Sequence, residues 1–200
     1  MIDSSIIDLY GVSAVSASAG DEYDLPIVTP STELNRGYFT NSYPKPAMGY
    51  LYVKDLLGDA LFTKALHKYI ENWHGKHPMP NDFFYSMNEG AGRNLNWFWK
   101  KWFFDTGYPD LAISSVQSKG SGYSVKVSSI GNKPVPVDLT VYYSDNTNEK
   151  IHRNIGVWEK GNTTVAIEIR TGKKIDKIHL GGDHVPDADT RNYDWTTQGK

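Results

Sequence analysis

The sequence predicts an α+β protein in two parts, a small α-helical bundle followed by an antiparallel β-sandwich. From Tyr43 to Gly107, apolar residues recur at steps of three and four, which is the spacing of helices packed on a core. After Asp110 they alternate with polar residues, as in strands with one buried face. Turns rich in Gly, Asn and Asp separate the alternating segments. We therefore expect a helical domain over residues 1–110 and a β-sandwich domain over residues 111–200.

The composition excludes several classes of function. Of the 200 residues, 39% are hydrophobic and 22% are charged, as in soluble globular proteins. A formal net charge of -2 provides no strong field for nucleic acid or anionic lipid, so neither is expected as a partner. The absence of cysteine excludes thiol catalysis, thiolate metal ligands and disulfides. No apolar run is long enough to span a membrane, and no signal peptide is visible.

The helical pattern becomes clear after residues 1–42, which are the least regular part of the chain. The segment Ala47–Leu57 is apolar on almost all sides, so we expect a buried helix that begins near Pro44 and Pro46. Gly58 is expected to end this helix, and Asp59 to cap the next one.

Three further helices are predicted before Asp110. The second carries an apolar stripe up to Trp73, and a loop over residues 74–81 follows it, closed by an Asn cap at Asn81. A shorter third helix is expected to stop at Gly90 and Gly92. The fourth lies in the aromatic stretch NLNWFWKKWFFDTGYPD at residues 94–110. It has a buried stripe formed by Leu95, Phe98, Trp99, Trp102 and Phe103, with Asn94 as its cap and Gly107 at its end.

The strands predicted after Asp110 are short and alternating. Three are clearest, around residues 123–127, 137–143 and 165–169. Turns are expected at residues 120–122, 131–132, 145–148 and 161–162, which is typical of an antiparallel sandwich.

Several landmarks in the helical part resemble the aminopeptidase N family of gluzincin zinc metallopeptidases. They are Tyr43-Pro-Lys45-Pro-Ala, Gly58-Asp59, Phe62, Tyr69, Trp73, KHPMPNDFF at residues 76–84 and the aromatic stretch, in that order. The resemblance implies that the bundle is the end of a thermolysin-like catalytic domain and that the strands are the small β-sandwich that follows it. It also implies a role for Tyr43 as the catalytic residue that donates a hydrogen bond to the oxyanion of the tetrahedral intermediate. The family's usual Lys-Gly is here Lys45-Pro46, which alters the start of the helix.

The resemblance implies a zinc enzyme that releases N-terminal residues from peptides, but the zinc ligands are not in this chain. The family takes two ligands and a general base from HExxH and a third ligand from a downstream glutamate, and no HExxH occurs in these residues. We therefore expect the C-terminal part of such a peptidase, inactive alone, with zinc bound only in the complete protein. The family resemblance favours a periplasmic or secreted location. Surface that the complete protein covers would permit self-association of this part.

Other candidate sites are weaker, and each has a structural alternative. His74 and His77 have H-x-x-H spacing in a loop without a third ligand, and a solvated loop is the alternative to a metal site. Calcium could be bound by four aspartates, for which turn formation is the alternative: Asp183, Asp187, Asp189 and Asp194. His179 and His184 are expected at the sandwich surface, and the acidic loop of residues 20–24 is expected in solvent.

A second class of function stays open. Trp158 could stack on a sugar or pack in the sheet. The alternative to a peptidase is thus a non-catalytic module that binds protein or carbohydrate on a retained peptidase scaffold.

Overall fold

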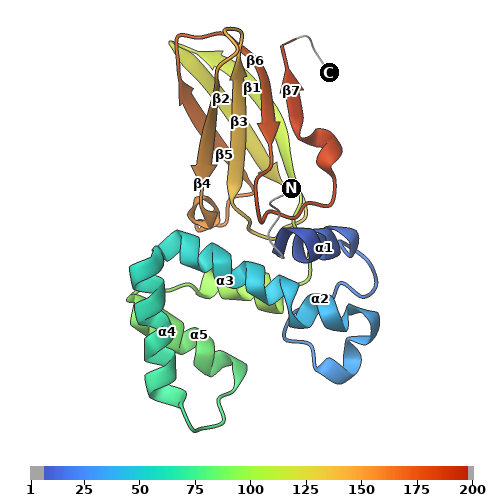
Figure 1. Ribbon diagram of the computed structural model, residues 1–200, viewed down its shortest axis with the longest axis vertical. Coiled ribbons are helices and arrows are strands. Elements are labelled where there is room, and N and C mark those ends of the chain that lie inside the picture. Colours follow the sequence, from blue (N-terminus) through green and yellow to red (C-terminus); the bar gives the residue numbers. More distant parts are fainter. Residues whose placement is uncertain (1–6, 198–200) are drawn as a thin grey trace.

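Helices and strands occupy opposite ends of the computed structural model, which describes residues 7–197 (Figure 1). The helical part contains short 3₁₀ and π segments (η) among its α-helices: η1 Ile7–Val12, α1 Ser13–Ala17, η2 Ser31–Glu33, η3 Asn35–Gly37, α2 Tyr38–Ser42, α3 Pro44–Leu57, α4 Asp59–Trp73, α5 Pro80–Ala91, α6 Asn96–Trp99 and η4 Lys100–Phe104. In Figure 1, α3 lies across the end of the sandwich, whereas α4 and α5 form a hairpin that points away from it.

The strands form two antiparallel sheets in the described part of the chain. Their bounds, with two 3₁₀ segments, are β1 Leu111–Lys119, β2 Gly122–Ser129, β3 Val137–Tyr143, β4 Asn148–Arg153, η5 Ile155–Trp158, β5 Thr164–Arg170, β6 Ile175–Leu180, η6 Thr190–Asn192 and β7 Asp194–Thr196. One sheet has the order β1-β2-β5 and the other β4-β3-β6-β7. Alternate residues of β3 are buried, which matches its period of two. The predicted α+β class, helices followed by a sandwich, is confirmed.

Two predicted helix caps are wrong. Asp59 is the first residue of α4 rather than its cap, because Gly58, at φ 76°, makes the turn from α3 by itself. Asn81 lies inside α5, which begins at Pro80. The Asp82 carboxylate instead accepts a hydrogen bond of 2.7 Å from the Met79 backbone N–H, ahead of the first turn.

Gly90 does not stop α5, because the helix continues to Ala91 and Gly92 closes it in the left-handed conformation. Gly90 instead lets α5 approach α4. A Cβ atom at this position would lie 2.5 Å from the Cα atom of Ala65. The glycine therefore serves close packing of two helices rather than termination.

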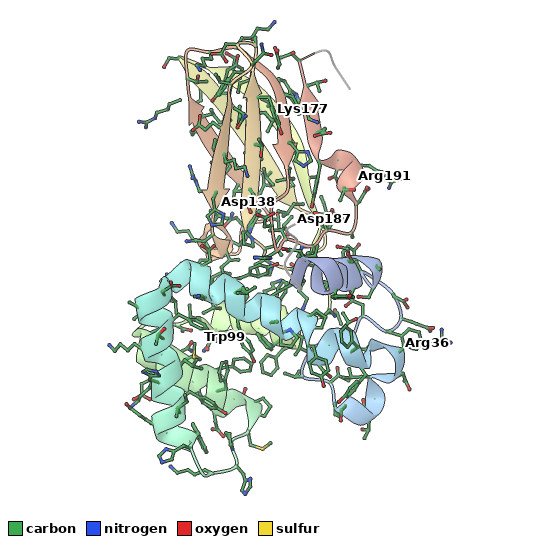
Figure 2. The ribbon with its side chains drawn as sticks, viewed as in Figure 1. Arg36, Trp99, Asp138, Lys177, Asp187 and Arg191 are labelled. Carbon is green, nitrogen blue, oxygen red and sulfur yellow. The ribbon has the colours of Figure 1, made fainter. Side chains whose placement is uncertain are left out.

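The aromatic stretch is helical but not one uniform α-helix. Its predicted stripe, from Leu95 to Phe103, is buried as expected, and Figure 2 shows Trp99 inside the helical part. The predicted cap at Asn94 is wrong by one residue, because Leu95 occupies the cap position of α6; the Asn94 side chain accepts a hydrogen bond of 2.9 Å from the Asn96 N–H just ahead of the helix. From Lys100 the helix widens into the π segment η4, and it ends at Phe104, before the predicted Gly107.

Lys133, in the connection between β2 and β3, donates hydrogen bonds to backbone carbonyls at the end of η4. Its ammonium donates to the carbonyls of Lys101 at 2.7 Å, Trp102 at 3.1 Å and Asp105 at 2.6 Å. These are carbonyls that the end of a helix leaves without backbone donors. Burial lowers the pKa of Lys133 to about 7, and the nearby charge of Lys45 adds to this effect.

One hydrophobic core runs through both ends of the molecule. It includes Met48 and Trp102 from the helices and Val135, Leu139 and Ile155 from the sandwich. Secondary structure changes between Phe104 and Leu111, close to the predicted boundary. The division into domains of residues 1–110 and 111–200 stays a prediction, since the core itself is continuous.

Candidate functional site

Tyr43 stands at the break between α2 and α3. Its backbone, at φ -126° and ψ -72°, leaves helical geometry for a single residue. Pro44 then begins α3, as the sequence predicts for a residue whose missing N–H does no harm at a helix start. The break directs the Tyr43 side chain away from the core, and the side chain is 57% exposed.

The residues on both sides of Tyr43 are anchored to the loop of residues 24–26. Asn41 is 2% exposed and donates to the Leu25 carbonyl at 2.9 Å. Lys45 is 6% exposed and pairs with the carboxylate of Asp24. The Lys45 carbonyl in turn accepts the indole N–H of Trp102 at 2.9 Å. Tyr43 is therefore an exposed side chain on an anchored section of backbone.

The Tyr43 side chain makes an aromatic ring contact with Phe39. Its ring lies 5.6 Å from that of Phe39, centroid to centroid, in a tilted arrangement. Within residues 7–197, no hydrogen bond engages its hydroxyl. A free phenolic O–H can donate to a developing oxyanion, which is the chemistry assigned to it by resemblance.

The residues present do not fit a zinc site. Between residues 7 and 197, no three His, Asp or Glu side chains gather in an arrangement that would hold a metal ion. His74 and His77 are both exposed in the loop between α4 and α5, and the His74 ring contacts the Ile70 carbonyl at 3.0 Å.

Three of the four aspartates considered for calcium are engaged in separate interactions. Asp187 is buried and accepts from the N–H groups of Leu111 and Asp189, both at 2.8 Å. Asp189 binds the Arg191 guanidinium through both oxygens. Asp194 pairs with His179 and Lys177, and Asp183 is exposed. Turn and loop formation therefore accounts for these residues better than calcium does.

The burial of Trp158 and Asp24 corrects two further predictions, a sugar-stacking surface and a solvated acidic loop. Trp158 is 5% exposed and its indole donates to the Val135 carbonyl at 2.8 Å, so its face is not open for a sugar. Asp24 is not solvated, because its side chain is only 4% exposed beside Lys45. His184, in contrast, does lie at the surface as expected, with a side chain that is 39% exposed and contacts the Asp8 carboxylate at 2.6 Å.

Sequence reasoning missed a cavity of about 830 Å³ at the junction of the two parts. It lies between the end of α3, strands β3 and β4, and the loop after β6. His152 on β4 reaches Asp55 on α3 and Asp138 on β3 there. The alternation of β4 could have placed His152 on one face, but nothing local pairs it with a residue 97 positions away.

Among residues 7–197, no helix combines the length and the apolar character that crossing a bilayer requires.

Comparisons with known proteins agree with the resemblance. Residues 11–102 match the peptidase family M1 domain. Aminopeptidase N of Haemophilus influenzae is 27% identical over 133 residues, covering 61% of this chain and 15% of the relative. Probable aminopeptidase 2 of Sulfurisphaera tokodaii is 28% identical over 92 residues, covering 46% of this chain and 12% of the relative.

A solved structure shares the fold. The chain matches Legionella pneumophila aminopeptidase A, crystallised with aspartic acid, at a TM-score of 0.57 and 18% identity, covering 74% of this chain and 17% of that one. The chain thus spans less than a fifth of each of these relatives. With helices that match the family M1 domain and a sandwich after them, the chain is similar to the C-terminal part of an M1 aminopeptidase-like protein.

Proposed function

We propose that this chain supplies the oxyanion-binding end of a zinc aminopeptidase, and that the zinc ligands and general base come from sequence outside these residues. The complete protein would release N-terminal residues from peptides. The observation that carries the proposal is the match of residues 11–102 to the peptidase family M1 domain, because it includes Tyr43 and the helix behind it. The family in general depends on zinc and acts on peptides.

The role of Tyr43 follows from the chemistry of amide cleavage. Attack on the scissile carbonyl creates a negatively charged oxygen, which a positioned O–H donor stabilises. The phenol of Tyr43 is exposed and has no hydrogen-bond partner in the described part of the chain, so it is free to take this role. The anchored residues Asn41 and Lys45 limit how far the backbone beneath it can move. One donor without a nucleophile or substrate anchor is not enough for catalysis, so the chain alone would be inactive.

The surface around Tyr43 supports the idea that further protein covers it. Tyr38 and Phe39 on α2 are 47% and 55% exposed, next to Tyr43 at 57%. Adjacent exposed aromatic side chains are typical of surfaces that another part of a protein covers. The same surface would allow this chain to self-associate when alone, which sedimentation at increasing concentration would measure. A periplasmic or secreted location is proposed from the family resemblance alone, and fractionation of the native cells would test it.

Two measurements test the proposal. Zinc content by elemental analysis and hydrolysis of an aminoacyl-anilide would be measured on this chain and on the longest natural reading frame that contains it. We expect zinc and activity only in the longer protein. If the longer protein has neither, the peptidase proposal fails and a non-catalytic binding module replaces it.

A further inference from the structure

The imidazole of His152 joins the helical part to the sandwich through two carboxylates. Its Nδ1 lies 2.7 Å from an oxygen of Asp138 on β3. Its Nε2 lies 2.9 Å from an oxygen of Asp55 on α3. Figure 2 shows Asp138 at the end of the sandwich that faces the helices. The three side chains lie on the wall of the cavity at this junction.

This geometry requires a protonated ring. An ionised carboxylate can only accept hydrogen bonds, so both ring nitrogens must donate. Only the imidazolium form of histidine has two N–H donors. Loss of one proton leaves a nitrogen lone pair facing a carboxylate, and that contact becomes repulsive. Both contacts of His152, with Asp138 and with Asp55, can therefore form only when the imidazole is protonated.

The surroundings of the ring favour the charged form. Burial lowers the pKa of His152, but the hydrogen bonds and negative charges of Asp138 and Asp55 outweigh it, so the pKa is raised above its ordinary value. Other charged groups lie around the same cavity and around a neighbouring groove between β4 and β5: Lys54 on α3, Asp59 on α4, Glu149, Lys150 and Arg153 on β4, Asp183 and His184 after β6, and Glu168 and Arg170 on β5. Their signs are mixed, and none of them makes a hydrogen bond to the imidazole ring.

We infer that His152 is a pH-dependent clamp that holds the end of α3 against the sandwich when protonated and releases it when neutral. Because the contact favours the charged ring, its contribution is complete below the ordinary histidine pKa of about 6.5 and is lost as pH rises through the folded-state value. On release, Asp55 would separate from His152, and the turn at Gly58 between α3 and α4 would loosen. The Tyr52 hydroxyl still donates to the His184 carbonyl at 2.7 Å, so the junction would loosen at one end rather than separate.

Amide hydrogen exchange at the α3–α4 turn tests the clamp. The reporters are the Gly58 N–H, bonded to the Lys54 carbonyl at 2.8 Å, and the Phe62 N–H, bonded to the Gly58 carbonyl at 3.0 Å. After correction for intrinsic exchange, we expect their protection to fall by about fivefold from about pH 5 to about pH 9, the upper end of the effect of a partly exposed ion pair. His152→Gln should remove this pH dependence, with low protection throughout.

Two further variants separate a titrating clamp from a merely structural contact. Asp55→Asn should give high protection at both ends of the pH range, because an amide can accept from a charged ring and donate to a neutral one. His179→Gln is the matched control, since His179 pairs with Asp194 at 2.7 Å entirely within the sandwich, and it should keep the wild-type pH dependence. Equal behaviour of the two glutamine variants would overturn the inference, and so would flat protection in the wild type.

A titration of the His152 ring by NMR in the wild-type protein completes the test if a variant does not fold. We expect its pKa above that of an unperturbed histidine, as the geometry requires. A pKa at or below that of an unperturbed histidine would overturn the inference.

Discussion

Replacing Lys45 by Met should destabilise the protein through the carboxylate that it leaves behind. The side chains of Lys45 and Asp24 are 7% and 4% exposed, so Asp24 would become a buried charge without its cation. Removing one partner of such a pair costs about 3–5 kcal/mol. Asp24 keeps one hydrogen bond, from the Gly20 N–H at 3.0 Å, and the Met side chain preserves most of the packed volume. We therefore expect the lower end of that range, about 3 kcal/mol.

Urea denaturation followed by circular dichroism measures this loss directly. For a protein of this size, about 3 kcal/mol also corresponds to a fall in Tm of roughly 6–12 °C. Lys54→Met is the matched control, because Lys54 pairs with Asp59 at 3.2 Å with both side chains well exposed. We expect its effect to stay within about 0.5 kcal/mol.

A double-mutant cycle separates the buried charge from the lost packing. Asp24→Leu combined with Lys45→Met should recover most of the stability, because no charge is then left buried. A loss below about 1 kcal/mol for Lys45→Met alone would refute the reasoning, since that is the range of an exposed pair. Purely additive losses in the double variant would refute it as well.

Three other outcomes are expected. Gly90→Ala should cost about 1–3 kcal/mol in urea denaturation despite the better helix propensity of alanine, because its Cβ would lie 2.5 Å from the Ala65 Cα; an unchanged stability would contradict the close approach. Because burial lowers the pKa of Lys133 from 10.5 to about 7, the unfolded chain binds more protons between these values, and stability should rise with pH across that window. Lys133→Met should remove this rise in denaturation curves taken at several pH values, and a slope that persists would show another group to be its source. Tyr43→Phe should change the stability of this chain by no more than about 0.5 kcal/mol, because the lost hydroxyl is exposed and has no partner among the described residues; a larger loss by calorimetry would mean that the hydroxyl is structural.

Local periodicity predicted the helices and strands well where one buried face distinguishes a helix from a strand. The stripe from Leu95 to Phe103 is buried as expected, and the alternation of β3 matches a strand with one face in the core. These patterns need no knowledge of the partner. They are enough to predict the α+β class and the order of helices before strands.

Features that depend on distant partners could not be predicted in this way. The π segment η4 ends on carbonyls that bind Lys133, which comes from the other part of the molecule. In the sequence, Asp24 is one of several acidic loop residues. Its pairing with Lys45, 21 positions away, is visible only in the structure. Gly90 resembled a helix stop because its role, contact with Ala65, is invisible in its own helix.

The candidate site, too, could not be predicted from local sequence patterns. Its one residue, Tyr43, was named by resemblance rather than by any property of its neighbours in sequence. The structure adds that its backbone is anchored and its hydroxyl is unpaired within residues 7–197. The catalytic role of Tyr43 stays a prediction, because the reacting groups lie outside these residues.

The most direct test of the proposed function is the turnover rate of the complete natural protein with Tyr43→Phe. If the phenol stabilises the oxyanion, kcat for an aminoacyl-anilide should fall by about 10²–10³, with zinc content unchanged and KM little altered. A variant that binds zinc normally and keeps the wild-type kcat would contradict the account.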